Sequence, residues 1–143
     1  MAHKILIVDD DPDVVELLRL ALEDSGYQVL SASNGIDALR KTQTLTPDLI
    51  LLDLMLPEVN GFTICERLRN ERATAQVPIL ILTALPGHFP RLAGMEAGAN
   101  DFLNKPFTIE ALLSRVDLLL TQAYPALEDY PLPVRHQRDT AAV

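Results

Sequence analysis

The chain has a single cysteine, Cys65, so it cannot form an internal disulfide, and we expect this thiol to lie in the core. Its longest apolar runs, such as residues 49–52, fall far short of the roughly 20 residues that a helix needs to cross a bilayer. The three histidines are scattered and do not have metal-ligand spacing. With no signal peptide evident, the expected location is the cytoplasm.

Basic residues are also scarce. Twelve lysines and arginines stand against 20 aspartates and glutamates, which gives a formal net charge of −8. Proteins that bind nucleic acid carry a basic patch, so we do not expect this chain to bind nucleic acid directly. The 143 residues fit one domain, and the 48% hydrophobic content is typical of an ordinary globular core.

Short apolar runs alternate with helix-like segments along most of the chain. Five runs rich in apolar and β-branched residues read as buried strands: 4–9, 28–32, 48–53, 77–82 and 101–103. The segments between and after them read as helices, over residues 12–25, 34–45, 60–72, a short stretch ending near 98, and 106–123. Asp11, with Pro12 directly after it, is a typical start for the first helix, and Gly26 a typical end.

This alternation predicts an α/β fold. Apolar strands separated by helices form a parallel sheet covered on both faces. We therefore expect a doubly wound five-stranded sheet of flavodoxin-like order 2-1-3-4-5. This domain is expected to span residues 1–123. Residues 124–143, with three prolines among polar residues, are expected to form an extended tail or a linker stub.

Polar residues gather where the predicted strands end. Asp9 and Asp10 end the first strand, Asp53 the third and Thr83 the fourth, and Lys105 follows the fifth. Ligands bind at this edge of open α/β sheets. Each residue alone has an ordinary explanation, such as an acidic helix start or a solvated loop lysine. Their occurrence at four strand ends instead indicates a functional site.

The residue types indicate phosphoryl transfer to a carboxylate. Three carboxylates at close range oppose one another's ionisation, and Mg²⁺ with its oxygen ligands would relieve that repulsion. Asp53 would be the nucleophile, since carboxylates form aspartyl phosphates. Lys105 and Thr83 would offset the charge of the phosphoryl group.

Four segments resemble the receiver domain of bacterial two-component response regulators, the CheY-like superfamily. They read ILIVDDDP, PDLILLDLMLPEVNGF, ILTA and GANDFLNKPF, and the resemblance covers about residues 3–122. It implies a phosphoacceptor at Asp53, Mg²⁺ held by Asp9, Asp10, Asp53 and the Met55 backbone carbonyl, and a phosphate contact from Lys105. It further implies a switch hydroxyl at Thr83, a rotating aromatic at Phe102, a cis bond before Pro106, and turn residues at Pro57 and Gly61.

The resemblance also implies the partners and the output. A histidine kinase or a histidine phosphotransfer protein would donate the phosphoryl group, and part of the first helix would dock the kinase. The domain would catalyse its own phosphorylation and slow dephosphorylation without being a conventional enzyme. The surface of the fourth helix, fifth strand and fifth helix would then change, with a homodimer as one possible result.

Two features depart from the family. Residues 85–90 read LPGHFP where charged residues are usual, so we expect a short fourth helix that starts late, with Pro90 in its first turn. We expect Phe89 to pack locally rather than to anchor a partner, and the family's usual dimer through this face should not be assumed. Met55 and Leu85, two residues past Asp53 and Thr83, are apolar. We hypothesise that they exclude the attacking water and prolong the phosphorylated state.

Two alternatives share parts of this pattern. A haloacid dehalogenase-like phosphatase could use Asp9, Asp11, Thr83 and Lys105, but it would leave Asp53 without a role. A flavodoxin-like binding module without phosphorylation would need a hydroxyl-rich loop after the first strand. This chain has three acids there, which would repel a phosphate in the absence of a metal.

Overall fold

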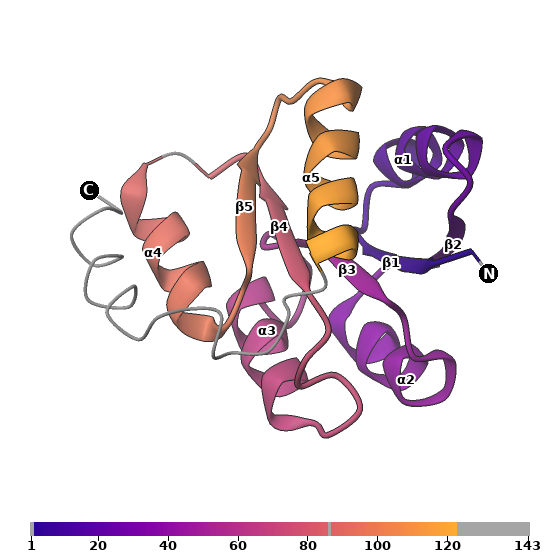
Figure 1. Cartoon of the computed structure of the whole chain (residues 1–143). Coiled ribbons are helices and arrows are strands. Elements are labelled where there is room, and N and C mark those ends of the chain that lie inside the picture. The colour runs from indigo at the N-terminus through magenta and orange to yellow at the C-terminus, as the bar shows by residue number, and fades with distance from the viewer. Residues whose placement is uncertain (1, 86, 123–143) are drawn as a thin grey trace.

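A computed structural model describes residues 2–85 and 87–122 (Figure 1). The strands in this part of the chain are β1 Lys4–Val8, β2 Gln28–Ala32, β3 Leu49–Asp53, β4 Ile79–Thr83 and β5 Asp101–Asn104. The helices are α1 Pro12–Asp24, α2 Gly35–Leu45, α3 Gly61–Asn70, α4 His88–Ala97 and α5 Ile109–Gln122. The predicted tail at residues 124–143 lies outside the described residues.

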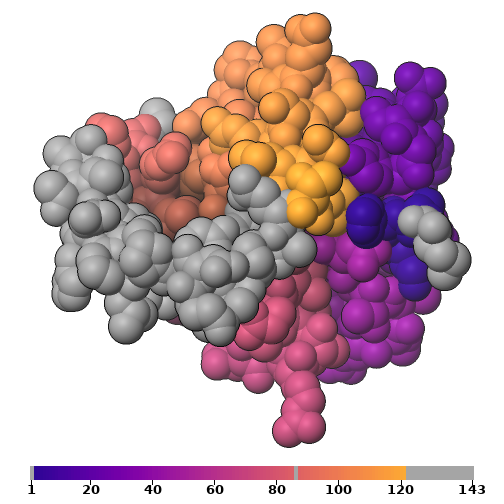
Figure 2. All heavy atoms as spheres, viewed as in Figure 1, coloured from indigo at the N-terminus to yellow at the C-terminus, as the bar shows by residue number. Residues whose placement is uncertain are grey.

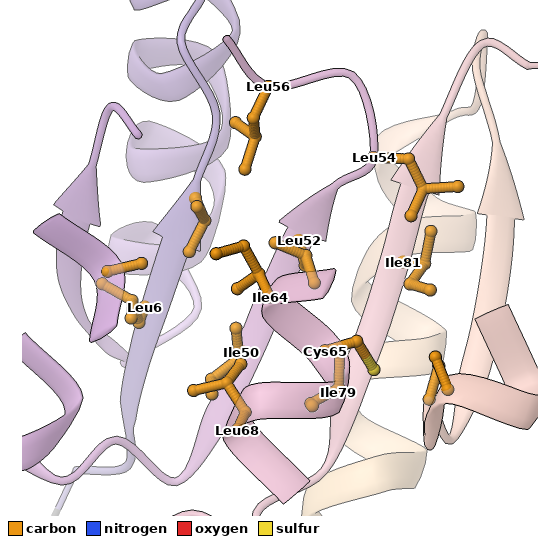
Figure 3. Close-up of a cluster of buried hydrophobic side chains, with 14 of the residues drawn as sticks. Leu6, Ile50, Leu52, Leu54, Leu56, Ile64, Cys65, Leu68, Ile79 and Ile81 are labelled. Atoms are coloured by element: carbon orange, nitrogen blue, oxygen red, sulfur yellow. The ribbon is translucent and has the colours of Figure 1, made fainter. Parts of the chain in front are cut away.

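The five strands form one parallel sheet in the order β2-β1-β3-β4-β5, which confirms the predicted fold. Two apolar clusters cover its faces. One joins the sheet to α2, α3 and α4 and contains Ile64, Leu68 and Ile81 (Figure 3). The other joins it to α1 and α5 through Leu18 and Val116. In the space-filling view α5 lies at the front of the molecule (Figure 2).

Side-chain caps define where three helices begin. The Asp11 carboxylate accepts a hydrogen bond from the Asp13 N–H at 2.9 Å, and Pro12 occupies the first helical position of α1. Asn34 and Asn60 accept equivalent bonds at the starts of α2 and α3. Each cap satisfies an N–H group that the helix itself leaves unpaired.

The strand boundaries differ slightly from the predicted ones. β1 ends at Val8, although the Asp9 N–H still donates to the Ala32 carbonyl at 3.1 Å. β4 begins at Ile79, because Pro78 has no N–H to donate to a ladder. No helix among residues 2–85 and 87–122 is long and apolar enough to cross a membrane.

The structure of α4 corrects two expectations, which concern its length and the packing of Phe89. The helix begins at His88, so Pro90 lies in its first turn as predicted. With ten residues it is as long as α3. The prediction that Phe89 packs locally is wrong, because its side chain is 86% exposed. Phe89 precedes the buried Gly94 by five residues, which places it about 140° around the helix from the face on the sheet.

The residues buried in the core agree with the apolar pattern of the sequence better than the start of α4 does. Cys65 is fully buried, as predicted, and burial raises the pKa of its thiol to about 11. Leu18 and Leu22 of α1 lie in the core, whereas Leu17 and Leu20 are exposed. Whether the exposed pair contacts a kinase stays a prediction.

Candidate functional site

The ends of two neighbouring strands bring the predicted acids together. Asp9 follows β1 directly and Asp53 is the last residue of β3, and these strands pair in parallel. One carboxylate oxygen from each of Asp9, Asp10 and Asp53 lies within 4.8 Å of the other two. Asp9 and Asp53 are buried, and Asp10 is exposed. The predicted convergence of three carboxylates is therefore present in the structure.

Lys105 follows β5 at the same carboxyl edge of the sheet and reaches this cluster from two strands away from β3. Its Nζ lies 3.2 Å from Asp9 Oδ2 and 3.6 Å from Asp53 Oδ2. The Lys105 N–H donates to the Thr83 carbonyl at 2.8 Å, which anchors the residue beside β4. The bond between Lys105 and Pro106 is cis, as the resemblance implied. One ammonium group thus contacts both buried carboxylates.

Both buried carboxylates are oriented by the backbone that follows them. Asp9 Oδ1 accepts from the Asp11 N–H at 2.9 Å, and Asp53 Oδ1 accepts from the Met55 N–H at 3.1 Å. In each case Oδ1 is held by a residue two positions on, and Oδ2 faces Lys105. This common geometry points both side chains toward one space beyond the strand ends.

The charge balance at the cluster favours a cation. Burial raises the pKa of the Asp53 carboxyl above its usual range. The Met55 N–H and the Lys105 ammonium lower that pKa, and the charges of Asp9 and Asp10 raise it again. Ionised Asp53 therefore carries a cost that one lysine does not remove. The donor set, three carboxylates, is of the hard oxygen type that suits Mg²⁺.

A close backbone approach positions the end of β3. The Gly61 N–H donates to the Leu54 carbonyl at 2.9 Å, so the start of α3 lies directly against the chain next to Asp53. A Cβ at Gly61 would come within 2.6 Å of Leu54 Cα and 2.8 Å of the Asp53 carbonyl oxygen. Only glycine allows this contact. The predicted turn residue therefore has a physical reason.

The Thr83 hydroxyl is hydrogen-bonded to the backbone. Its side chain is fully buried, and its Oγ1 accepts from the Leu85 N–H at 3.2 Å. Within the described part of the chain, no hydrogen bond joins it to Asp53. Phe102 is also buried and packs in the same core cluster as Ile81. The switching roles of Thr83 and Phe102 stay predictions, as does the metal contact from the Met55 carbonyl.

The residues found from the sequence did not include Asn104. Its Nδ2 donates to the Leu85 carbonyl at 3.1 Å, next to the Thr83 hydroxyl. Asn104 stands beside Lys105 in the sequence, but only the strand register places it opposite Thr83. No sequence signal distinguishes it from an ordinary strand-end asparagine.

A surface depression lies beside the site. It is lined by Asp9, Asp10, Val15, Glu16 and Ser31 and borders the carboxylates, between the loops that follow β1 and β2. Two of the three carboxylates, those of Asp9 and Asp10, therefore line a depression that is open to solvent.

Comparisons with known proteins agree with this geometry. The family model of the response regulator receiver domain matches residues 5–117. The DNA-binding dual master transcriptional regulator RpaA of Synechocystis is 49% identical over 117 residues, which cover 82% of this chain and 48% of that protein. The alkaline phosphatase synthesis transcriptional regulatory protein PhoP of Bacillus subtilis is 44% identical over 123 residues, which cover 86% of this chain and 50% of that protein. The chain thus spans about half the length of these curated relatives.

Solved structures match over most of their length. A putative response regulator from Chloroflexus aurantiacus has a TM-score of 0.81 and 43% identity, covering 85% of this chain and 99% of that one. The receiver domain of a signal transduction histidine kinase from Syntrophus aciditrophicus has a TM-score of 0.80 and 35% identity, covering 87% and 95% respectively. These matches do not favour the phosphatase or the flavodoxin-like alternative.

Proposed function

Starting from the fact that the chain belongs to the response regulator receiver domain family, we propose that Asp53 accepts a phosphoryl group from a histidine kinase or a histidine phosphotransfer protein. One observation carries the proposal: Lys105 Nζ lies between Asp9 and Asp53, 3.2 Å and 3.6 Å from their Oδ2 atoms, in a cluster of three carboxylates. This arrangement combines a nucleophile, a fixed positive charge and a set of hard oxygen ligands.

The transfer step exchanges one phosphorus bond for another. An oxygen of Asp53 attacks the phosphorus of a phosphohistidine, a P–O bond forms and the P–N bond breaks. The imidazole leaves with the electron pair of the broken bond and takes up a proton. Lys105 keeps its ammonium group beside the oxygens on which negative charge develops. The product is an aspartyl phosphate, a mixed anhydride.

Asp9, Asp10, Asp53 and the Met55 carbonyl would hold Mg²⁺, which when bound offsets the charge of the phosphoryl oxygens. Asp9 and Asp53 are already held in position by backbone N–H groups. The ion therefore needs little rearrangement of these two side chains. Such preorganisation is consistent with a domain that catalyses its own phosphorylation and slow dephosphorylation.

Phosphorylation would act on Thr83 and Phe102. The Thr83 hydroxyl would turn from the Leu85 N–H toward the phosphoryl group, and Phe102 would take up the vacated space. The surface formed by α4, β5 and α5 would change as a result, and a homodimer or a downstream protein would read that change. A cytoplasmic location, where such kinases present their phosphohistidine, is part of the same proposal.

Acetyl phosphate with Mg²⁺ tests the proposal directly. We expect intact-mass analysis to show one added phosphoryl group, mapping to the peptide that contains Asp53 and sensitive to hydroxylamine. A chelator should abolish the labelling, and Asp10→Asn should slow it about tenfold or more, a loss of ~1.4 kcal/mol or more in transition-state stabilisation. Asp11→Asn is the matched control, because asparagine preserves the α1 cap. Labelling of a serine or histidine, or equal rates in both variants, would refute the proposal.

The lifetime of the phosphorylated form provides a second prediction. Met55, beside Asp53, is 56% exposed, and Leu85 is partly buried. If these apolar side chains exclude water, Met55→Asn should shorten the half-life of the aspartyl phosphate by about tenfold, or ~1.4 kcal/mol of barrier. Leu118→Asn, at an exposed leucine on α5, is the control. A radiolabel chase in which the wild type decays within seconds would disprove the hypothesis.

A further inference from the structure

Thr83 and Asn104 hold the backbone of Leu85 on both sides of its Cα, the first at the N–H and the second at the carbonyl. The two residues are register partners at the ends of β5 and β4. The Leu85 N–H donates to Thr83 Oγ1 at 3.2 Å, and the Leu85 carbonyl accepts from Asn104 Nδ2 at 3.1 Å. The backbone just beyond the end of β4 is thereby tied to the end of β5. We call this chain of two hydrogen bonds the Leu85 tether.

The Leu85 tether includes the Thr83 hydroxyl, which is the group that moves in the proposed switch. Thr83 is fully buried, and its Oγ1 has the Leu85 N–H as its partner. The Thr83 carbonyl is separately held by the Lys105 N–H at 2.8 Å, so the backbone of Thr83 is fixed while its side chain can rotate. Rotation toward Asp53 would leave the Leu85 N–H without its acceptor. A new partner for that N–H requires the Leu85 backbone to move, and the bond from Asn104 to the Leu85 carbonyl opposes such a movement.

The Leu85 side chain packs against the core, but the start of α4 itself has few polar restraints. Its N-cap residue is Gly87, with φ of 92°, and no side chain caps the helix. The first turn contains no acidic residue to complement the helix dipole. Phe89, in this turn, contacts little of the domain, since it is 86% exposed. The Asn104 bond is therefore a notable restraint on this end of the helix.

The other end of α4 is held firmly. The Arg69 side chain donates to the Gly98 carbonyl at 2.8 Å and to Asn100 Oδ1 at 2.6 Å. The Gly98 and Ala99 N–H groups close the last turn of the helix. A helix anchored at its C-terminal end and lightly held at its N-terminal end can respond to a change near Thr83.

We propose that Asn104 is a positioning residue that holds Leu85, and through it Thr83, in the resting arrangement and so opposes switching. This inference rests on the proposed function of Asp53. Loss of the Asn104 amide should lower the cost of moving Leu85, so the phosphoryl-bound arrangement forms more readily. A single hydrogen bond of this kind corresponds to a change of about two- to tenfold in an equilibrium.

Two measurements on Asn104→Ala test the inference. In the resting protein, amide exchange followed by NMR should be about two- to tenfold faster at Leu85 than in the wild type. Beryllofluoride with Mg²⁺, a stand-in for the phosphoryl group, should half-saturate the variant at a concentration lower by a similar factor. Asn104→Gln, which keeps an amide donor, should restore both values toward the wild type. Asn70→Ala, at an exposed asparagine ending α3, should leave both unchanged.

The outcomes separate this inference from the proposed function. Unchanged exchange at Leu85 in Asn104→Ala would refute the tether, and faster exchange with unchanged or weaker beryllofluoride binding would refute its opposition to switching. Failure of Asn104→Gln to restore either value would assign the effect to packing rather than to the donor, which also refutes the inference. A wild type indifferent to beryllofluoride would instead refute the proposed function, and with it the switching role of Asn104.

Discussion

Asp53→Asn is expected to lower labelling by acetyl phosphate and by a phosphorylated histidine kinase to below about 1% of the wild-type level, because the amide cannot act as the nucleophile. The side chain keeps its size at a position that is 7% exposed, so the fold should be preserved. Intact-mass analysis and beryllofluoride titration provide the measurements. Asp11→Asn is the control, because it removes an acid next to the cluster without removing a predicted ligand. Asp48→Asn would be less suitable, because Asp48 Oδ2 accepts a hydrogen bond from the Lys4 N–H.

The same variant should be more stable than the wild type in metal-free buffer. Burial raises the pKa of Asp53, so between its usual pKa and the raised value the folded state binds more protons than the unfolded state. The stability of the wild type therefore falls as pH rises through that window. Asparagine does not titrate, so the melting temperatures of the two proteins should diverge as pH rises from acid to neutral.

Two results would contradict these expectations. Persistent one-to-one labelling of Asp53→Asn by acetyl phosphate would place the nucleophile elsewhere, with Asp9 as the next residue to replace. A variant that melts below the wild type at neutral pH would show that the ion pair with Lys105 outweighs the burial cost.

Gly61→Ala should cause the largest loss of stability from a single added carbon in this region. The new Cβ would lie 2.6 Å from Leu54 Cα and 2.8 Å from the Asp53 carbonyl oxygen, and these backbone atoms cannot rotate away. We expect a loss of about 3 kcal/mol in the free energy of unfolding, from overpacking of a close backbone contact. Denaturant titration measures it. Because α3 must move away from the end of β3, beryllofluoride affinity should also fall.

Gly26→Ala is the control for Gly61→Ala, because it separates the effect of steric crowding from the effect of backbone conformation. Gly26 has a φ of 96°, but a Cβ added there would meet no atom within 4 Å, so alanine should cost about 1–2 kcal/mol through strain alone. It lies far in sequence from the carboxylates and should not affect beryllofluoride affinity. Equal losses in the two variants, or an unchanged affinity in Gly61→Ala, would show that the contact with Leu54 does not position Asp53.

The arrangement of the acids could be predicted because it follows from chain direction. Parallel strands place their carboxyl ends at one edge, so Asp9 and Asp53 had to meet if β1 and β3 were neighbours. The alternation of apolar runs and helices indicated such a sheet, and the receiver resemblance agreed with it. The same reasoning predicted that Lys105 and Thr83 lie at this edge. It did not predict the distances between these residues.

The errors concern positions that local sequence does not constrain. Phe89 was expected to pack because large aromatic side chains usually do, yet its place on α4 depends on where that helix starts. The start at His88 turns Phe89 to solvent and turns the small residues Gly94 and Ala97 to the sheet. Asn104 was missed because its partner, the Leu85 carbonyl, lies 19 residues away.

The sequence by itself determined the fold class, the strand and helix segments to within a few residues, and the residue types at the carboxyl edge. These depend on apolar periodicity and capping, which act over short distances along the chain. Only the tertiary structure decided which groups meet across strands. It brought Lys105 between Asp9 and Asp53, and held the Thr83 hydroxyl on Leu85 beside Asn104. Those contacts join distant residues, so they depend on sheet register and helix placement, which no single segment encodes.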